Sequence, residues 1–188
     1  YLPAICTSTI VGTVFSKIFE TNRGYLNVIL RALHLDFLCQ QWLATPKTAL
    51  ACLLFVNIWQ WTGYSMLMYY TNMLNIPQDL YESATIDGAG SFKQFIYITF
   101  PLLRGTHITL IILDILGALK FFDLSYVLTD GGPAHATETF STYIYTKSFS
   151  TFQQGQASTI VVYMFLIAMV LTVIQLKIYY KKDKKEMS

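Results

Sequence analysis

The sequence predicts an all-α, polytopic membrane protein, a bundle of apolar helices with short polar segments between them. Hydrophobic residues make up 54% of the 188 residues and charged residues only 13%, about half the usual charged share of a soluble domain. Four apolar runs are long enough to cross the hydrocarbon core of a bilayer, which takes about 20 residues in a helix. Long, unbroken runs of this kind indicate helices, because lipid offers the backbone no hydrogen-bond partners.

The four predicted spans form a single transmembrane domain over residues 1–188. They lie at about 1–19, 48–70, 102–122 and 157–178. The last twelve residues, KIYYKKDKKEMS, hold five of the thirteen basic side chains, which is typical of a cytoplasmic flank. With four spans, both chain ends and an insert at 77–101 then face the cytoplasm, and the segments 20–47 and 123–156 face outward. Arg23, Arg31, Lys47 and Lys147 lie in those outer segments, so the orientation depends on the tail.

Several features exclude other classes of protein. The chain begins at Tyr1 and shows no signal-peptide pattern, so we expect that an N-terminal part is missing. The three cysteines are isolated and no Cys/His spacing suggests a metal, so no metal or other cofactor is expected. No basic face is interleaved with stacking aromatic residues, which argues against nucleic-acid binding.

The insert at 77–101 begins with a predicted short helix over Gln78–Asp87. Asn75 is a candidate N-cap with Pro77 close to the start of the helix. Asp79 and Glu82 sit in the first turns, where the helix dipole favours carboxylates. Gly88-Ala89-Gly90 should end the helix, because glycine takes a left-handed conformation without steric cost.

A second helix is predicted after this turn. Ser91 and Gln94 match a capping box, and Phe92, Phe95, Ile96 and Thr99 recur at helical spacing. Pro101 follows where the chain turns into the third span. A cytoplasmic helix–turn–helix between two spans is a candidate docking element. From the residues alone, a lid or a solvated loop explains the insert equally well.

The insert resembles the EAA motif of ATP-binding cassette (ABC) importer permeases. Glu82-Ser83-Ala84, three residues, Gly88, nine residues, then Ile98 and Pro101 match its pattern, EAA-x3-G-x9-I-x-L-P. Ser83 stands where the pattern has alanine, and Phe100 where it has leucine. The resemblance implies that the insert couples the permease to an ATPase subunit, with Asp79, Glu82, Ser83, Ala84, Asp87, Gly88, Ile98 and Pro101 as coupling residues.

The resemblance extends over the whole chain. YLPAI is similar to the beginning of the third helix of a six-helix permease, GYLNVILRAL to the outer loop that follows, and WQWTGYSMLMY to the fourth helix. FFDLSYVLTDGGPAHATETFSTYIYTKSF resembles an outer segment particular to permeases for oligosaccharides, maltose-type sugars and glycerol phosphate. Two N-terminal spans would then be missing. The fold implied is that of a type I ABC importer permease.

The resemblance implies that the chain is a transport subunit in a prokaryotic cell membrane and that this subunit carries a sugar or oligosaccharide. Its partners would be a second permease subunit, expected as a heterodimer, two ATP-binding cassette subunits that hydrolyse ATP, and an extracellular solute-binding protein. Glycerol phosphate is an alternative solute. A channel or scaffold without ATP coupling is a weaker alternative, which the insert argues against. An intramembrane enzyme would need a nucleophile–base pair or metal-ligand spacing within the spans, and neither is present.

Candidate residues of the sugar path lie in the second and third spans. Asp114 follows Arg104 by ten residues, about 15 Å along a helix, so its costly carboxylate should face a water-filled path or a subunit interface. A purely structural hydrogen bond is the alternative for Asp114. The full set of candidates is Asn57, Gly63, Tyr64, Asp114, Gly117 and Phe121. By resemblance, related sugar permeases use these zones, although Trp59, Trp61 and Tyr64 are equally explained as interface or lipid-facing aromatics. His34 and His107 suggest no chemistry.

Overall fold

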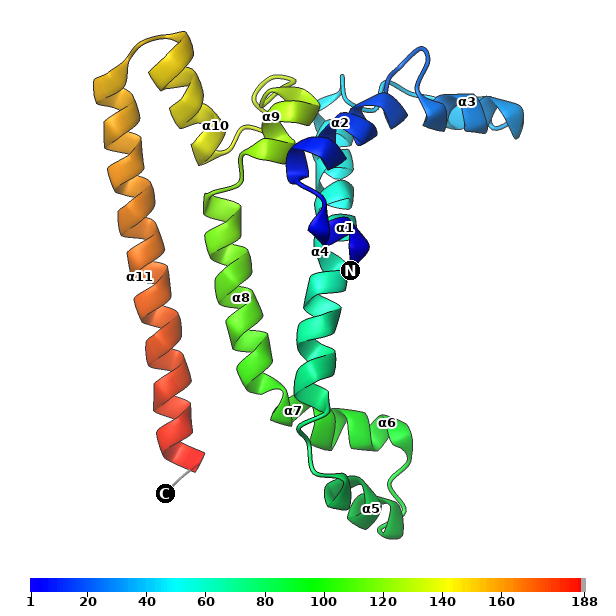
Figure 1. The fold of residues 1–188 in the computed structure, drawn as a ribbon, viewed down its shortest axis with the longest axis vertical. Coiled ribbons are helices and arrows are strands. Elements are labelled where there is room, and N and C mark those ends of the chain that lie inside the picture. The colour runs from blue at the N-terminus through cyan, green and yellow to red at the C-terminus, as the bar shows by residue number, and fades with distance from the viewer. Residues whose placement is uncertain (187–188) are drawn as a thin grey trace.

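The computed structural model describes the backbone of residues 1–186 and the side chains of residues 1–177, and every regular element in that part of the chain is helical. The elements are α1 (Leu2–Ile5), α2 (Ser8–Ile18), α3 (Tyr25–Ala32), η1 (Asp36–Leu38), α4 (Pro46–Met73), α5 (Gln78–Ile86), α6 (Ser91–Gln94), the π turn η2 (Phe95–Thr99), α7 (Phe100–Leu102), α8 (Arg104–Leu119), α9 (Asp123–Thr129), α10 (Phe140–Tyr145), the π turn η3 (Thr146–Ser150) and α11 (Gln154–Glu186). The molecule is elongated: α4, α8 and α11 run along its length, α2, α3, α9 and α10 gather at one end, and α5 and α6 lie at the other (Figure 1).

The prediction of one continuous helix over residues 1–19 is wrong. The chain is extended at Cys6 and Thr7, between α1 and α2. The Thr7 hydroxyl accepts a hydrogen bond from the N–H of Ile10 and so caps α2. In a continuous helix that N–H would bond the carbonyl of Cys6, which instead accepts from the buried Gln60 amide at 3.1 Å. The break is therefore fixed both locally and by α4.

The other three predicted spans coincide with helices, but a count of four spans is not confirmed. Residues 48–70 lie within α4, 102–122 overlap α8, and 157–178 lie within α11. By length and composition, one helix of the described chain could cross a membrane by itself, Gln154–Lys177. A second candidate is the bent pair Ser91–Leu102 and Arg104–Leu119. The four-span topology and its orientation stay predictions, and the basic tail from 178 onward lies outside the described side chains.

The hydrophobic core sits at the end of the molecule where α2, α4 and α9 meet. Its buried members are Val11, Phe19, Cys52, Leu53, Val56, Leu124 and Leu128. Gly12 permits the close packing of α2 on α9, since an added Cβ would lie 3.1 Å from the Val127 side chain. Most of the described side chains of α11, up to Lys177, and many of α4 are exposed in the single chain, as expected where lipid or other subunits cover them.

The predicted outer segment 20–47 is held together by one buried asparagine. Asn27 is only 2% exposed, and its amide donates to the carbonyls of Thr21 at 2.9 Å and Gln40 at 3.1 Å. Its oxygen accepts from the indole N–H of Trp42 at 2.8 Å. Because both amide hydrogens and the amide oxygen have partners, α3 is fixed against the chain that leads into α4.

Candidate functional site

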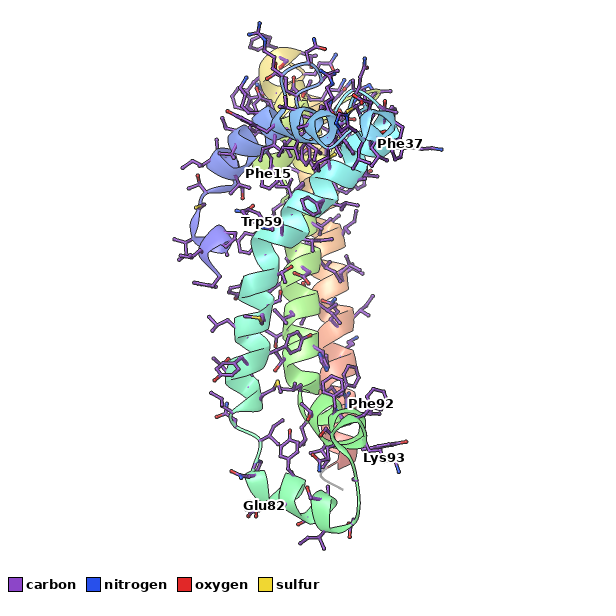
Figure 2. The ribbon with its side chains drawn as sticks, turned by 90° about the vertical axis from the view of Figure 1, so that its right-hand side faces the viewer. Phe15, Phe37, Trp59, Glu82, Phe92 and Lys93 are labelled. Carbon is purple, nitrogen blue, oxygen red and sulfur yellow. The ribbon has the colours of Figure 1, made fainter. Side chains whose placement is uncertain are left out.

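The predicted short helix of the insert is confirmed as α5, with Asp87 as its C-cap residue. Asp79 lies in the first turn, and no residue of α5 is buried. Glu82 projects from the end of the molecule opposite to Phe37 (Figure 2), and Glu82, Ser83 and Asp87 are exposed while Ala84 is half-buried. The helix therefore presents acidic side chains, together with the exposed apolar side chains of Leu80 and Ile86, clear of the long helices.

Gly88 ends α5 as predicted. Its φ is +77°, a conformation that favours glycine. The N–H of Gly88 bonds the carbonyl of Thr85 at 3.0 Å, and the N–H of Ala89 bonds that of Ala84 at 2.9 Å. This pair of bonds is the Schellman arrangement, which satisfies two carbonyls at the helix end and reverses the chain.

Both predicted side-chain caps of the insert are wrong. The residue at the N-cap of α5 is Pro77, whereas the Asn75 amide donates back to the carbonyl of Thr71. Gly90 caps α6, so Ser91 and Gln94 form no capping box. The Gln94 amide instead reaches α5, where it donates to the Thr85 hydroxyl at 2.9 Å, and to the carbonyl of Ala89 at 3.0 Å. A tertiary contact thus outcompetes the local cap.

A π turn interrupts the second helix of the insert. The N–H of Phe100 bonds the carbonyl of Phe95, five residues earlier, and Pro101 follows with no N–H to continue the ladder. Phe92, Phe95 and Ile96 are exposed, whereas Ile98 is half-buried and Thr99 is buried. The chain does turn here, but it bends at Leu103 rather than at Pro101, by 62° between Ser91–Leu102 and Arg104–Leu119.

A series of hydrogen bonds connects α5 to the π turn and, through Phe100, to the long helices α8 and α4. The hydroxyl of Tyr81 on α5 lies 2.8 Å from that of Thr99. His107 on α8 lies with Nδ1 2.8 Å from the Tyr69 hydroxyl of α4, and with Nε2 3.2 Å from the carbonyl of Phe100. No pattern in the sequence indicates these contacts, because His107 is a lone histidine and a single tyrosine in an apolar helix has no distinctive spacing.

The structure does not bring the candidate path residues into one cluster. Asn57, Gly63 and Tyr64 are half-buried on α4, while Asp114 and Gly117 are exposed on α8. Among residues 1–177, no hydrogen bond or ring contact links the two groups. Two candidates have packing roles. A Cβ at Gly63 would lie 2.5 Å from the backbone nitrogen of Tyr1, and Phe121 packs against the core of α2, α4 and α9.

A cavity of about 310 Å³ lies in the predicted outer segment 123–156, lined in part by Tyr126, Asp130, Glu138 and Tyr145. The rings of Tyr126 and Tyr145 meet edge to face at 5.1 Å, and a hydrogen bond with Tyr145 raises the pKa of Tyr126. A tyrosine phenol is already protonated at physiological pH, and this shift favours the same form.

Buried hydroxyls hold the turn that forms one wall of this cavity. Ser125 donates to the carbonyl of Thr137 at 2.6 Å, and Thr137 donates to that of Gly132 at 2.7 Å. Asp130, Ala134 and His135 all have positive φ without being glycine, so the turn is held in a strained conformation.

Comparisons with known proteins identify the family to which the chain belongs. The model of the family described as "Binding-protein-dependent transport system inner membrane component" matches residues 2–182. The chain belongs to this family. The permease is 35% identical over 186 residues to the probable ABC transporter permease protein YurN of Bacillus subtilis (strain 168), which covers 99% of this chain and 63% of that protein. It is 33% identical over 177 residues to the trehalose/maltose transport system permease protein MalF of Thermococcus litoralis, with 94% and 59% covered.

The permease fold is also that of a solved transporter. A bacterial ABC transporter involved in the import of the acidic polysaccharide alginate superposes with a TM-score of 0.87 at 23% identity, over 96% of this chain and 63% of that chain. This likeness confirms the expected all-α permease fold. The chain spans less than two thirds of the length of these curated relatives. The family is one of membrane-embedded transport subunits, which confirms the resemblance seen in the EAA-like motif.

Proposed function

We propose that this chain is the membrane-spanning permease subunit of an ATP-driven importer, and that α5 is where ATPase subunits dock. The observation that carries the proposal is the turn at Gly88, where two backbone hydrogen bonds end α5 and reverse the chain toward α6. In this position Glu82 and Asp87 are exposed and lie clear of the long helices. A docking helix must be exposed, and it must keep its position relative to the spans through every cycle. Closure of two ATPase subunits would move α5, and the permease itself would hydrolyse nothing.

The proposed topology places α5 in the cytoplasm and the core of α2, α4 and α9 at the outer side. The support is the distance between these parts, which lie at opposite ends of the long helices (Figure 1), together with the basic tail in the sequence. The cavity beside Tyr126 would then open toward the solute-binding protein.

The proposed solute is a sugar or oligosaccharide, delivered by a solute-binding protein and passed along α4 and α8 beside a second permease subunit. The names of the trehalose/maltose relative and of the alginate importer support this class. Asn57, Tyr64 and Asp114 offer the hydrogen-bonding groups, and aromatic rings of α4 the flat apolar faces, that saccharides require. Asp114 is exposed in the single chain, which suits a carboxylate at a subunit interface or a water-filled path.

The test is uptake by vesicles that contain the permease, a second permease, the ATPase and the solute-binding protein, all encoded by the same organism. A panel of labelled malto-, arabino- and uronate oligosaccharides is offered with glycerol phosphate as the contrasting solute. ATP-dependent accumulation of an oligosaccharide, lost when the ATPase is omitted, is expected. Accumulation that proceeds without ATP would refute the importer assignment, and uptake of glycerol phosphate alone would refute the saccharide.

A further inference from the structure

We propose that Tyr81, Thr99, His107 and Tyr69 form a mechanical link that carries the movement of α5 into α8 and α4. In this link Tyr81 and His107 are positioning residues: they touch no solute and no nucleotide, but they hold the docking helix in a fixed relation to the spans. The inference rests on the proposed function, because it assigns a path for the movement that α5 receives.

The first part of the link joins α5 to the π turn. No residue of α5 is buried, so few contacts tie this helix to the rest of the chain. The hydroxyl pair of Tyr81 and Thr99, at 2.8 Å, is one of them, and Thr99 is only 3% exposed. Gln94 provides a second contact through Thr85. A hydrogen bond shielded from water resists displacement better than an exposed one.

The second part of the link joins the π turn to α8 and α4. Thr99 is followed by Phe100, whose carbonyl lies 3.2 Å from Nε2 of His107. A carbonyl only accepts, so Nε2 carries the proton, and in the neutral ring Nδ1 must then accept from the Tyr69 hydroxyl at 2.8 Å. One imidazole therefore attaches both long helices to the residue that follows Thr99.

The imidazole also braces the bend at Leu103. Phe100 precedes the bend and His107 follows it, so their hydrogen bond spans the 62° change of direction. The Phe100 ring lies 4.6 Å from the imidazole and the Tyr69 ring 5.2 Å from it, between ring centroids. The hydrogen bond and the ring contact between Phe100 and His107 both cross the bend, so straightening it would break both together.

The rival explanation is that these hydrogen bonds only stabilise the fold. Two matched controls separate the explanations, since Tyr97 is 76% exposed beside Thr99 and Tyr70 is 59% exposed beside Tyr69. Within the described residues neither control hydroxyl makes a hydrogen bond. Replacement of any of these tyrosines by phenylalanine removes one oxygen atom and keeps the ring.

The experiment measures solute taken up per ATP hydrolysed by the assembled importer in vesicles. We expect Tyr81→Phe and Tyr69→Phe to keep substrate-stimulated ATP hydrolysis while uptake per ATP falls about fivefold, the factor for one buried hydrogen bond. Thr99→Val should match Tyr81→Phe because it breaks the same bond. The double variant Tyr81→Phe/Tyr69→Phe should lose little more than the worse single variant, since the two bonds lie in series. The link would be overturned if uptake per ATP were equal in Tyr81→Phe and Tyr97→Phe, or in Tyr69→Phe and Tyr70→Phe.

A second measurement does not depend on transport. Spin labels at Gln78→Cys on α5 and Ile111→Cys on α8, with Cys6 and Cys39 replaced by serine, report the distance between the two helices in the assembled complex. Tyr81→Phe should broaden the distance distribution, and Tyr97→Phe should leave it unchanged. If no solute is transported, the proposed function fails while this distance still decides the link. An identical distribution in both variants would overturn the link even in a complex that transports.

Discussion

Gly88 gives the sharpest test of α5 as a docking helix. The change Gly88→Val places a β-branched side chain at φ +77°, and no heavy atom lies within 4 Å of the added Cβ. The cost therefore comes from the backbone conformation and not from a clash. A forced left-handed conformation costs about 1–3 kcal/mol. The two hydrogen bonds that close the turn contribute about 1 kcal/mol each, so the strain is as large as the turn's own stabilisation.

The expected result is that α5 leaves its docked geometry. A cost of about 2 kcal/mol shifts the equilibrium between docked and displaced α5 by roughly 30-fold. Membrane insertion should be unaffected, because the substitution does not touch the long helices. Gly88→Val should therefore reach the membrane in normal amounts, lose the co-purifying ATPase, and lose substrate-stimulated hydrolysis in reconstituted vesicles. Gly88→Asn should retain more of the bound ATPase and of the stimulated hydrolysis than Gly88→Val, since asparagine tolerates the left-handed conformation better than most non-glycine residues.

Gly90→Val is the matched control for this series. Gly90 has a φ of −68° and also has no heavy atom within 4 Å of an added Cβ, so valine is permitted there. Full ATPase binding and coupled uptake by Gly88→Val, or an equal loss in Gly90→Val, would show that the left-handed turn is not what positions α5.

Three further predictions concern other parts of the chain. Asp114→Leu should lower uptake and leave the amount of permease in the membrane unchanged, because the predicted path needs a polar group at mid-membrane; unaltered uptake would leave Asp114 with a structural role. A cysteine at position 90 should react with an impermeant thiol reagent only in inside-out vesicles, and Ser150→Cys only in intact cells; labelling of position 90 in intact cells would reverse the topology. Asn27→Ala should lower the free energy of unfolding by about 2–4 kcal/mol, because it removes three hydrogen bonds and leaves buried groups unpaired. The midpoint of thermal unfolding in detergent measures the loss, and Asn22→Ala, at an exposed position, is the control that should leave this midpoint unchanged.

Local chemistry made α5 and its turn predictable from the sequence. Acidic residues near the start, glycine at the end and a polar composition all act within a few residues of one another. The break before α2 depends on the local Thr7 cap and on Gln60, more than fifty residues away, whose amide bonds the Cys6 carbonyl; a contact at that separation leaves no local pattern. Gln94 forms no cap because its amide finds partners across the turn, in the Thr85 hydroxyl on α5 and the carbonyl of Ala89.

The link through Tyr81 and His107 could not be read from the sequence at all. Its hydrogen bonds join residues 18 and 38 positions apart, and such pairs leave no periodic pattern in a single chain. Tyr81 stands directly before the motif glutamate, but nothing in the motif distinguishes its hydroxyl from that of exposed Tyr97. The candidate path residues stay predictions, because in the permease they would face subunits that a single chain does not contain.

The π turn η2 lies between the proposed docking helix α5 and the bend into α8. An α-helix rotates about 100° per residue, and a π turn holds one residue more than an α-helical turn would. Because the wider turn absorbs that extra residue, the helical segments on either side of it keep their rotation about the axis. Deleting one residue from Phe95–Thr99 should therefore leave an ordinary α-helical turn, with α5 facing nearly the same way. The π turn thus gives the second helix a place where the loss of one residue could be absorbed without rotating the proposed docking helix away from its partner.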